Sequence, residues 1–170
     1  MIKLFIMDVD GTLTDGKIYL GNNGEEFKAF NVKDGLGIKK LFEVGITPII
    51  ITGRNSRITE TRCKELGIKH LFQNVVNKKI ILNKISNQFC VDFSQMAYIG
   101  DDINDLECIT SCGLSACPND SFSKVVANVN YVCNNKGGAG CVREFIEYVI
   151  ECNNKEIENE NSCNNANKVE

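Results

Sequence analysis

The alternation of short apolar segments with longer segments of helical period is the feature that most constrains this fold. Six runs rich in β-branched and aromatic residues are nearly apolar on both faces, and we expect strands at residues 4–7, 46–51, 69–72, 96–99, 113–116 and 130–132. We expect helices at 35–44, 56–66, 78–89, 103–110 and 121–127, and a last one at 141–152. Strands apolar on both faces and separated by helices indicate a parallel sheet covered on both sides. The sequence therefore predicts a doubly wound α/β domain.

Two segments depart from this alternation. Residues 17–30, KIYLGNNGEEFKAF, contain two short strand-like runs around a Gly-Asn-Asn-Gly turn, a pattern typical of a β-hairpin. The hairpin follows the first strand, so we expect it to lie over the carboxyl edge of the sheet. Residues 153–170 are rich in Asn and Glu and contain no aromatic residue, which predicts a disordered tail. Residues 1–152 are expected to form one domain.

Composition excludes several classes of function. A net charge of −3 and a pI near 5.3 argue against a nucleic-acid partner. No apolar run approaches the ~20 residues of a membrane-spanning helix, and the N-terminus does not resemble a signal peptide, so we expect a cytoplasmic protein without a membrane partner. The nine cysteines are irregularly spaced and His70 is the one histidine, which makes a zinc site improbable and favours reduced thiols.

Asp8 and Asp10 follow the first expected strand directly, within the sequence DVDGT. A calcium loop does not fit, because its glycine would fall on Leu13 and its bidentate Glu on Tyr19. Two carboxylates ~4 Å apart repel by ~4 kcal/mol at an effective dielectric constant of ~20, so they need a cation or a shared proton. A bound Mg²⁺ would supply the cation and leave coordination positions for water and phosphate oxygens.

Polar residues follow three other expected strands. Thr52 and Gly53 end the second strand, Lys78 begins the helix after the third, and GDDIND, which contains Asp101, follows the fourth. Each signal alone is weak, and the acids of GDDIND could instead stabilise a helix N-terminus through the helix dipole. Together, at the carboxyl ends of parallel strands, they predict an acid-lined Mg²⁺ site with one cation and one hydroxyl.

These four motifs resemble those of the haloacid dehalogenase superfamily of phosphotransferases, which have a Rossmann-like fold. The resemblance implies that Asp8 attacks phosphorus and becomes an aspartyl phosphate, and that Asp10 acts as general acid and base. It also implies that Thr52 and Lys78 hold the transferring phosphoryl group. Mg²⁺ would be bound by the Asp8 carboxylate, the Asp10 backbone carbonyl and Asp101. Lys78 follows Thr52 by only 26 positions, which leaves no room for a cap domain.

The segments FNVKDGLGI, ITGRNS and GGAG before VRE further resemble 3-deoxy-D-manno-octulosonate 8-phosphate phosphatases. That resemblance implies a sugar-acid phosphate substrate and a homotetramer without a cap. In it, the hairpin and the glycines Gly137, Gly138 and Gly140 would help to close a neighbouring subunit's site. Arg54 and Arg62 would bind the substrate, together with Gly53.

Two alternatives remain open from the sequence. Phosphatases of nine-carbon keto-deoxy acid (KDN or sialic acid) 9-phosphates tend to carry Glu where Arg54 stands and Lys where Glu65 stands, so the present pair favours the eight-carbon substrate. REF at residues 143–145 nevertheless resembles the nine-carbon group. The second alternative is a non-catalytic, phosphatase-like oligomerisation module, although such modules usually lose members of the catalytic set.

Overall fold

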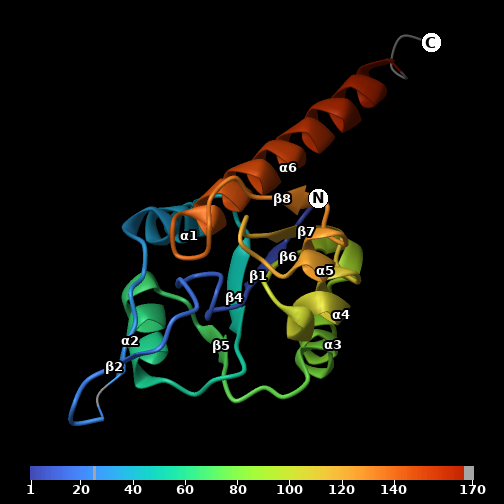
Figure 1. The fold of residues 1–170 in the computed structure, drawn as a ribbon. Helices are drawn as coiled ribbons and strands as arrows, with labels where there is room; N and C mark the ends of the chain where they lie inside the picture. The colour runs from blue at the N-terminus through green and yellow to red at the C-terminus, as the bar shows by residue number, and fades with distance from the viewer. Residues whose placement is uncertain (25, 167–170) are drawn as a thin grey trace.

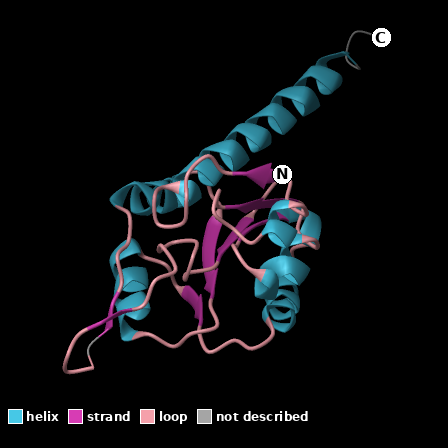
Figure 2. Cartoon of the chain, viewed as in Figure 1, coloured by secondary structure: helices cyan, strands magenta, loops and turns pink. Residues whose placement is uncertain are grey.

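The computed structural model describes residues 1–24 and 26–166, which form a six-stranded sheet between two layers of helices (Figures 1 and 2). The strands are β1 (Leu4–Met7), β4 (Thr47–Ile51), β5 (His70–Phe72), β6 (Met96–Ile99), β7 (Leu114–Cys117) and β8 (Tyr131–Val132). Every neighbouring pair is parallel, in the order β5-β4-β1-β6-β7-β8. The predicted doubly wound α/β architecture is therefore confirmed.

Two hydrophobic clusters separate the helices into layers. One layer contains α1 (Val32–Glu43), α2 (Arg57–Leu66) and α6 (Cys141–Ala166), and the other contains α3 (Lys78–Phe89), α4 (Leu106–Ile109) and α5 (Ser123–Val126). Two 3₁₀ helices, η1 (Phe93–Gln95) and η2 (Ile103–Asp105), complete the elements. Alternate residues of β1 contribute to opposite clusters, because successive strand side chains point to opposite faces of a sheet.

The chain order places the functional edge of the sheet between β1 and β6. After β1 the chain adds β4 and then β5 on one side, and it crosses to β6 on the other side of β1. Loops leave this point in opposite directions, which opens a crevice beyond the carboxyl ends of the two strands. Asp8 follows β1 and Asp101 follows β6, so the topology brings two distant acidic motifs to one crevice.

The hairpin expected at 17–30 is present as a separate two-stranded antiparallel sheet. Its strands are β2 (Tyr19–Leu20) and β3 (Glu26–Phe27), and the turn is closed by the Gly24 N–H, which donates to the Gly21 carbonyl at 3.1 Å. The hairpin projects from the domain beside α2 (Figure 1). Between Thr52 and Lys78 the chain forms α2 and β5, so this connection holds no cap domain.

The C-terminal region differs from the expected disordered tail. Helix α6 does not end near residue 152 but continues to Ala166, and residues 167–170 lie outside the described part of the chain. Its sequence contains no Gly or Pro, and a Glu151–Lys155 ion pair of 2.7 Å supports an exposed turn. The Asn153 amide also pairs with both backbone groups of Ile2, at 2.7 and 2.9 Å, which fixes this part of the helix to the start of the sheet.

Among the residues that the structure describes, no helix combines the length and the apolar character that crossing a bilayer requires.

Candidate active site

Asp8 lies directly after β1 and is almost fully buried. The alternation of side chains along β1 places it on the same face of the sheet as Ile6, which packs in the layer of α3. Lys78 is the first residue of α3, whose N-terminus is capped by the Asn77 side chain accepting from the Ile80 N–H at 3.1 Å. This placement lets the buried Lys78 Nζ donate to Asp8 Oδ1 at 2.6 Å.

Asp105 is a site residue to which the sequence motifs assigned no role. It is fully buried, and its Oδ1 accepts from Lys78 Nζ at 2.7 Å and from the Tyr98 hydroxyl at 2.6 Å. Its Oδ2 accepts the backbone N–H groups of Asp101 and Asp102, at 3.3 and 3.4 Å. The sequence feature that could have identified Asp105 is the spacing within GDDIND, where Asp105 falls one helical turn after Asp101.

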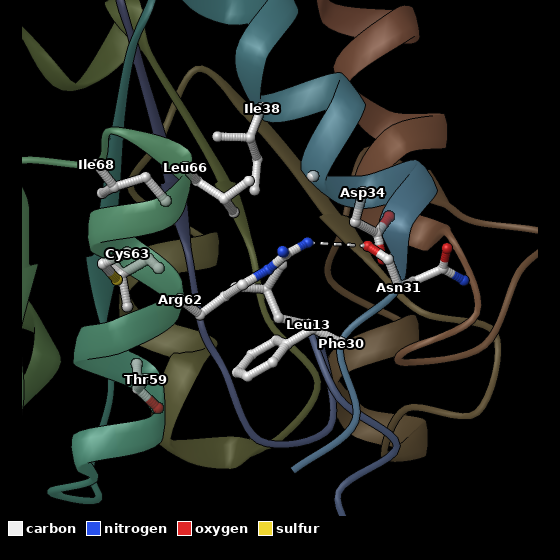
Figure 3. Close-up of a pocket in the computed structure, with 12 residues that line it drawn as sticks. Leu13, Phe30, Asn31, Asp34, Ile38, Thr59, Arg62, Cys63, Leu66 and Ile68 are labelled. Atoms are coloured by element: carbon white, nitrogen blue, oxygen red, sulfur yellow. Dashed lines mark hydrogen bonds between the residues drawn. The ribbon is translucent and has the colours of Figure 1, made fainter.

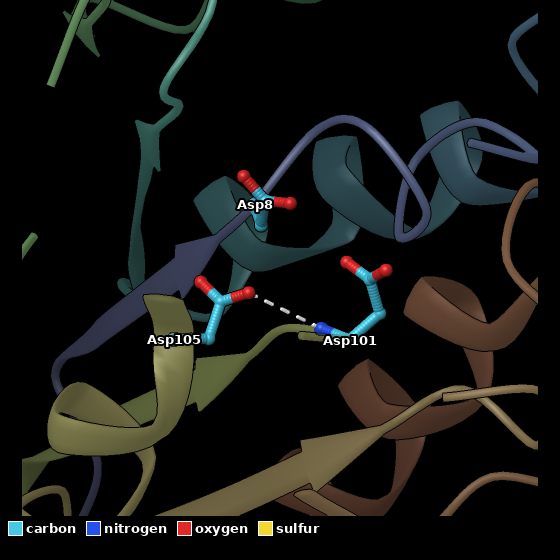
Figure 4. Close-up of side chains that lie close together, drawn as sticks. All are labelled: Asp8, Asp101 and Asp105. Atoms are coloured by element: carbon cyan, nitrogen blue, oxygen red, sulfur yellow. Dashed lines mark hydrogen bonds between the residues drawn. The ribbon is translucent and has the colours of Figure 1, made fainter. Parts of the chain in front are cut away.

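Asp8, Asp101 and Asp105 form a carboxylate cluster in which one oxygen of each lies within 4.8 Å of the others (Figure 4). The backbone turns sharply at Gly11, where φ is +94°. A Cβ atom at Gly11 would lie 2.1 Å from Asp101 Oδ2, so only glycine lets the loop approach this carboxylate. Thr12 Oγ1 donates to Asp101 Oδ1 at 3.3 Å from the same loop.

The charges in this cluster are unbalanced. Burial, followed by repulsion from Asp105, raises the pKa of Asp8 well above its ordinary value and that of Asp101 to about 6. Burial lowers the pKa of Lys78, but attraction to Asp8 and Asp105 outweighs burial and raises the pKa overall. Three carboxylates face one ammonium, and the hard oxygen donors fit a divalent cation such as Mg²⁺.

A cavity of about 220 Å³ opens at the carboxyl edge of the sheet. It brings together most of the residues that the sequence selected, and its lining consists of Asp8, Asp10, Thr52, Gly53, Arg54, Asp101, Asp102 and Asn104. Thr52 is buried, and its backbone N–H is held by the Phe72 carbonyl at 2.9 Å. Lys78 is not among the lining residues, but its Nζ donates to Asp8, which is one of them.

The hairpin contributes two charged side chains that the sequence interpretation did not select. Lys28 forms a close ion pair with the Asp10 carboxylate, and Glu26 accepts from Arg54 Nη2 at 3.0 Å. Asp10 therefore points toward the hairpin rather than into the carboxylate cluster, which leaves only its backbone carbonyl as a possible metal ligand. The sequence feature that could have identified Glu26 and Lys28 is the charged segment GEEFK, which lies in a hairpin already expected over the site.

Arg62 and Glu65 do not line this cavity. Arg62 lies in a small pocket between α1 and α2, over the Phe30 ring, and donates to Asn31 O at 3.5 Å (Figure 3). It also pairs with Glu65 at 2.9 Å. The pocket holds about 10 Å³, room for one water molecule at most. Within this chain, the placement of Arg62 gives no support to its expected contact with substrate.

The glycine segment, residues 137–140, packs on the loop that follows Asp8 in its own chain, residues 9–15, which is called the catalytic loop below. Gly138 N–H donates to the Thr12 carbonyl at 3.0 Å, and a Cβ atom at Gly137 would lie 2.0 Å from the Gly11 carbonyl oxygen. Gly138 and Gly140 both adopt positive φ angles, of +68° and +105°. The expected contribution of these glycines to a neighbouring site stays a prediction.

Comparison with known proteins agrees with this geometry. Residues 69–146 match the family model of haloacid dehalogenase-like hydrolases. The chain is 42% identical over 149 residues to the 3-deoxy-D-manno-octulosonate 8-phosphate phosphatase KdsC of Salmonella typhi, an alignment that covers 88% of this chain and 79% of that protein.

Solved structures show the same likeness. The crystal structure of the 3-deoxy-D-manno-octulosonate 8-phosphate phosphatase from Yersinia pestis is 41% identical, with a TM-score of 0.88 over 91% of this chain and 83% of that one. The corresponding Moraxella catarrhalis phosphatase, solved with magnesium, phosphate and KDO, is also 41% identical. Its TM-score is 0.86, and the match covers 88% of this chain and 86% of that one.

Proposed function

Because the chain belongs to the 3-deoxy-D-manno-octulosonate 8-phosphate phosphatases, within the haloacid dehalogenase-like hydrolases, we propose that Asp8 is the nucleophile of this reaction. The enzyme is a phosphoric monoester hydrolase that converts 3-deoxy-D-manno-octulosonate 8-phosphate to KDO and phosphate. The observation that carries the proposal is the buried Asp8–Lys78–Asp105 arrangement at the end of β1. It supports the proposal because the Asp8 carboxylate, which lines the cavity, is held beside one fixed cation.

In the first step, an oxygen of the Asp8 carboxylate attacks phosphorus and the bond from phosphorus to the sugar oxygen breaks. Asp10 gives a proton to the leaving oxygen, and the product on the enzyme is an aspartyl phosphate. In the second step, water attacks that phosphorus, Asp10 takes the water's proton and Asp8 is restored. Asp10 suits both steps, because it lines the cavity without belonging to the carboxylate cluster.

Charge neutralisation is the main requirement of phosphoryl transfer, because an anionic nucleophile must approach an anionic phosphate. The cofactor is Mg²⁺. Asp8, Asp101 and the Asp10 carbonyl would hold it, and when bound it would screen both reactants and stabilise the developing charge. Lys78 keeps Asp8 oriented and can donate to the phosphoryl oxygens. Thr52 and Gly53 line the same cavity as Asp8 and would hold those oxygens.

Arg54 is the best candidate for contact with the sugar acid. It lines the cavity, 40% of its side chain is exposed, and its guanidinium already holds a carboxylate, that of Glu26. A guanidinium binds carboxylates in a planar, two-pronged geometry, which suits the carboxylate of an ulosonic acid. Glu65 lies outside the cavity, so in this chain any discrimination between eight- and nine-carbon substrates falls on Arg54 and its neighbours.

We also propose the homotetramer implied by the resemblance, and the exposed apolar side chains of the hairpin support it. Ile18, Leu20 and Phe27 are 54%, 71% and 57% exposed. Leu20 and Phe27 lie on β2 and β3, which pair only with each other among the residues that the structure describes. Apolar side chains gathered on an open edge are typical of an interface. Light scattering of wild type and of Leu20→Glu tests this, and an unchanged mass in the variant would count against the hairpin interface. The expected cytoplasmic location stays a prediction.

The proposed reaction is tested by phosphate release from 3-deoxy-D-manno-octulosonate 8-phosphate and from a nine-carbon 9-phosphate, with and without Mg²⁺. We expect Mg²⁺-dependent release that favours the eight-carbon substrate. Asp8→Asn should abolish release without unfolding the protein, and Asp92→Asn, outside the cavity, is the matched control. Activity that persists in Asp8→Asn would refute the nucleophile. An absence of turnover in a tetrameric wild type would favour the non-catalytic module.

A further inference from the structure

Tyr98 is a fully buried tyrosine directly beneath the active site. It belongs to β6 and is paired in register with Ile6 of β1, two residues before Asp8. Its side chain lies in the same hydrophobic cluster as Ile6, on the α3 face of the sheet. Burial, followed by the nearby Asp105 charge, raises the pKa of Tyr98 well above its ordinary value, so the hydroxyl is a hydrogen-bond donor at neutral pH.

The hydroxyl donates to the same oxygen that holds the catalytic lysine. Asp105 Oδ1 accepts from Tyr98 at 2.6 Å and from Lys78 Nζ at 2.7 Å, and Lys78 in turn donates to Asp8 at 2.6 Å. All four residues are buried, so water cannot replace a missing donor. The chain of bonds runs from the core of the sheet to the nucleophile.

The other Asp105 oxygen is occupied as well. Oδ2 accepts the backbone N–H groups of Asp101 and Asp102, and a Cβ atom at Gly100 would lie 2.3 Å from the Asp105 carboxyl carbon. The carboxylate is thus enclosed by close neighbours and held by donors on both oxygens. Removal of the Tyr98 hydroxyl would leave Asp105 Oδ1 bound by Lys78 alone, and this oxygen could then shift toward the lysine.

We propose that Tyr98 is a positioning residue for phosphoryl transfer, which orients Lys78 toward Asp8 by fixing the shared oxygen of Asp105. This inference rests on the proposed roles of Asp8 and Lys78. A buried tyrosine hydroxyl usually finds some partner for its own sake. Here the partner atom is the one that sets the direction of the lysine, so the bond has a consequence for the reaction as well as for stability.

The test compares Tyr98→Phe, which removes only the hydroxyl, with wild type on two substrates, the octulosonate 8-phosphate and p-nitrophenyl phosphate. Because the defect would lie at the phosphoryl end, we expect kcat to fall about tenfold on both substrates, with KM changed less than about twofold. Tyr131→Phe is the matched control: it also removes a tyrosine bond to a carboxylate, that to Glu144 at 3.0 Å, outside the cavity lining. It should keep the wild-type kcat.

A purely structural role for Tyr98 predicts a different result. Tyr98→Phe would then melt at a lower temperature but keep the wild-type kcat per folded molecule, and this outcome would overturn the proposal. A loss confined to the sugar substrate would overturn it too. A wild type that cleaves only p-nitrophenyl phosphate would refute the sugar assignment and leave the Tyr98 comparison valid. A crystal structure of the variant gives a readout without turnover, in which the distance from Lys78 Nζ to Asp8 Oδ1 should be longer than the 2.6 Å of wild type.

Discussion

Asp34 joins helices α1 and α6, and the pH dependence of protein stability offers a quantitative test of this contact. It lies in α1 and is almost fully buried, and its Oδ1 accepts the backbone N–H of Arg143 in the first turn of α6 at 2.8 Å. Its Oδ2 makes no hydrogen bond of normal geometry, although the Gly140 and Val142 amides also favour its ionised form. Burial dominates, and it raises the pKa of Asp34 from 3.8 to about 6 against the opposing attraction of Arg62.

The raised pKa of Asp34 determines how protein stability changes with pH. An acid with a raised pKa in the folded state contributes stability that is complete below its unfolded pKa and is lost as pH rises through its folded pKa. Integration of the two titrations between about pH 5 and about pH 7.5 gives a loss of about 1.4 kcal/mol, and the full effect over all pH is about 3 kcal/mol. Asp34→Asn keeps one acceptor oxygen and does not titrate, so it lacks this dependence.

Urea unfolding followed by circular dichroism, at one protein concentration and without Mg²⁺, measures the effect. We expect the unfolding free energy of wild type, relative to Asp34→Asn, to fall by about 1.4 kcal/mol between about pH 5 and about pH 7.5. Asp8 and Asp101 titrate in both proteins and cancel in the difference. Parallel stability curves for the two proteins, or curves that diverge in the opposite direction, would refute the argument.

Other perturbations address the acid cluster itself. Gly11→Ala should lower phosphatase activity by about 100-fold, because its Cβ would displace Asp101; kinetics at saturating Mg²⁺ that match wild type would exclude this. Lys78→Met should abolish turnover. Without Mg²⁺ it should also lower the free energy of unfolding by about 3 kcal/mol or more, because it leaves Asp8 and Asp105 buried without a cation. Chemical unfolding measures this, and a decrease of less than about 1 kcal/mol would contradict it. Mg²⁺ should raise the melting temperature of wild type by mass action but not that of Asp101→Asn, and an equal rise in both would place the ion elsewhere.

The sequence predicted the sheet well because each strand carries its own signal. The run from Leu4 to Met7 is apolar on both faces and ends in Asp8, which marks both the strand and its functional end. The carboxyl-edge rule then collects Thr52, Lys78 and Asp101 from distant segments. These are local patterns combined with one rule of topology, and no knowledge of side-chain packing was needed.

Residues whose roles depend on packing could not be predicted in the same way. Tyr98 resembles any core residue of a buried strand, and only the three-dimensional structure shows which oxygen its hydroxyl meets. Arg62 shows the same dependence on packing, because its guanidinium lies over the Phe30 ring in this chain. Its expected contact with substrate stays a prediction. The extent of α6 was missed because contacts far away in sequence, such as Asn153 with Ile2, stabilise a segment of unremarkable composition.

The contact between the glycine segment and the catalytic loop has a consequence for the order in which the enzyme is made. The loop that follows Asp8 leaves the ribosome early, but its Thr12 carbonyl is bonded by Gly138 and by the Cys141 thiol, which are synthesised more than 120 residues later. Domains acquire their final packing only when the required segments have emerged. We therefore expect a nascent chain that ends at residue 136 to contain all six strands of the sheet but not the final packing of the loop that follows Asp8. An incomplete chain would therefore have no phosphatase activity during translation.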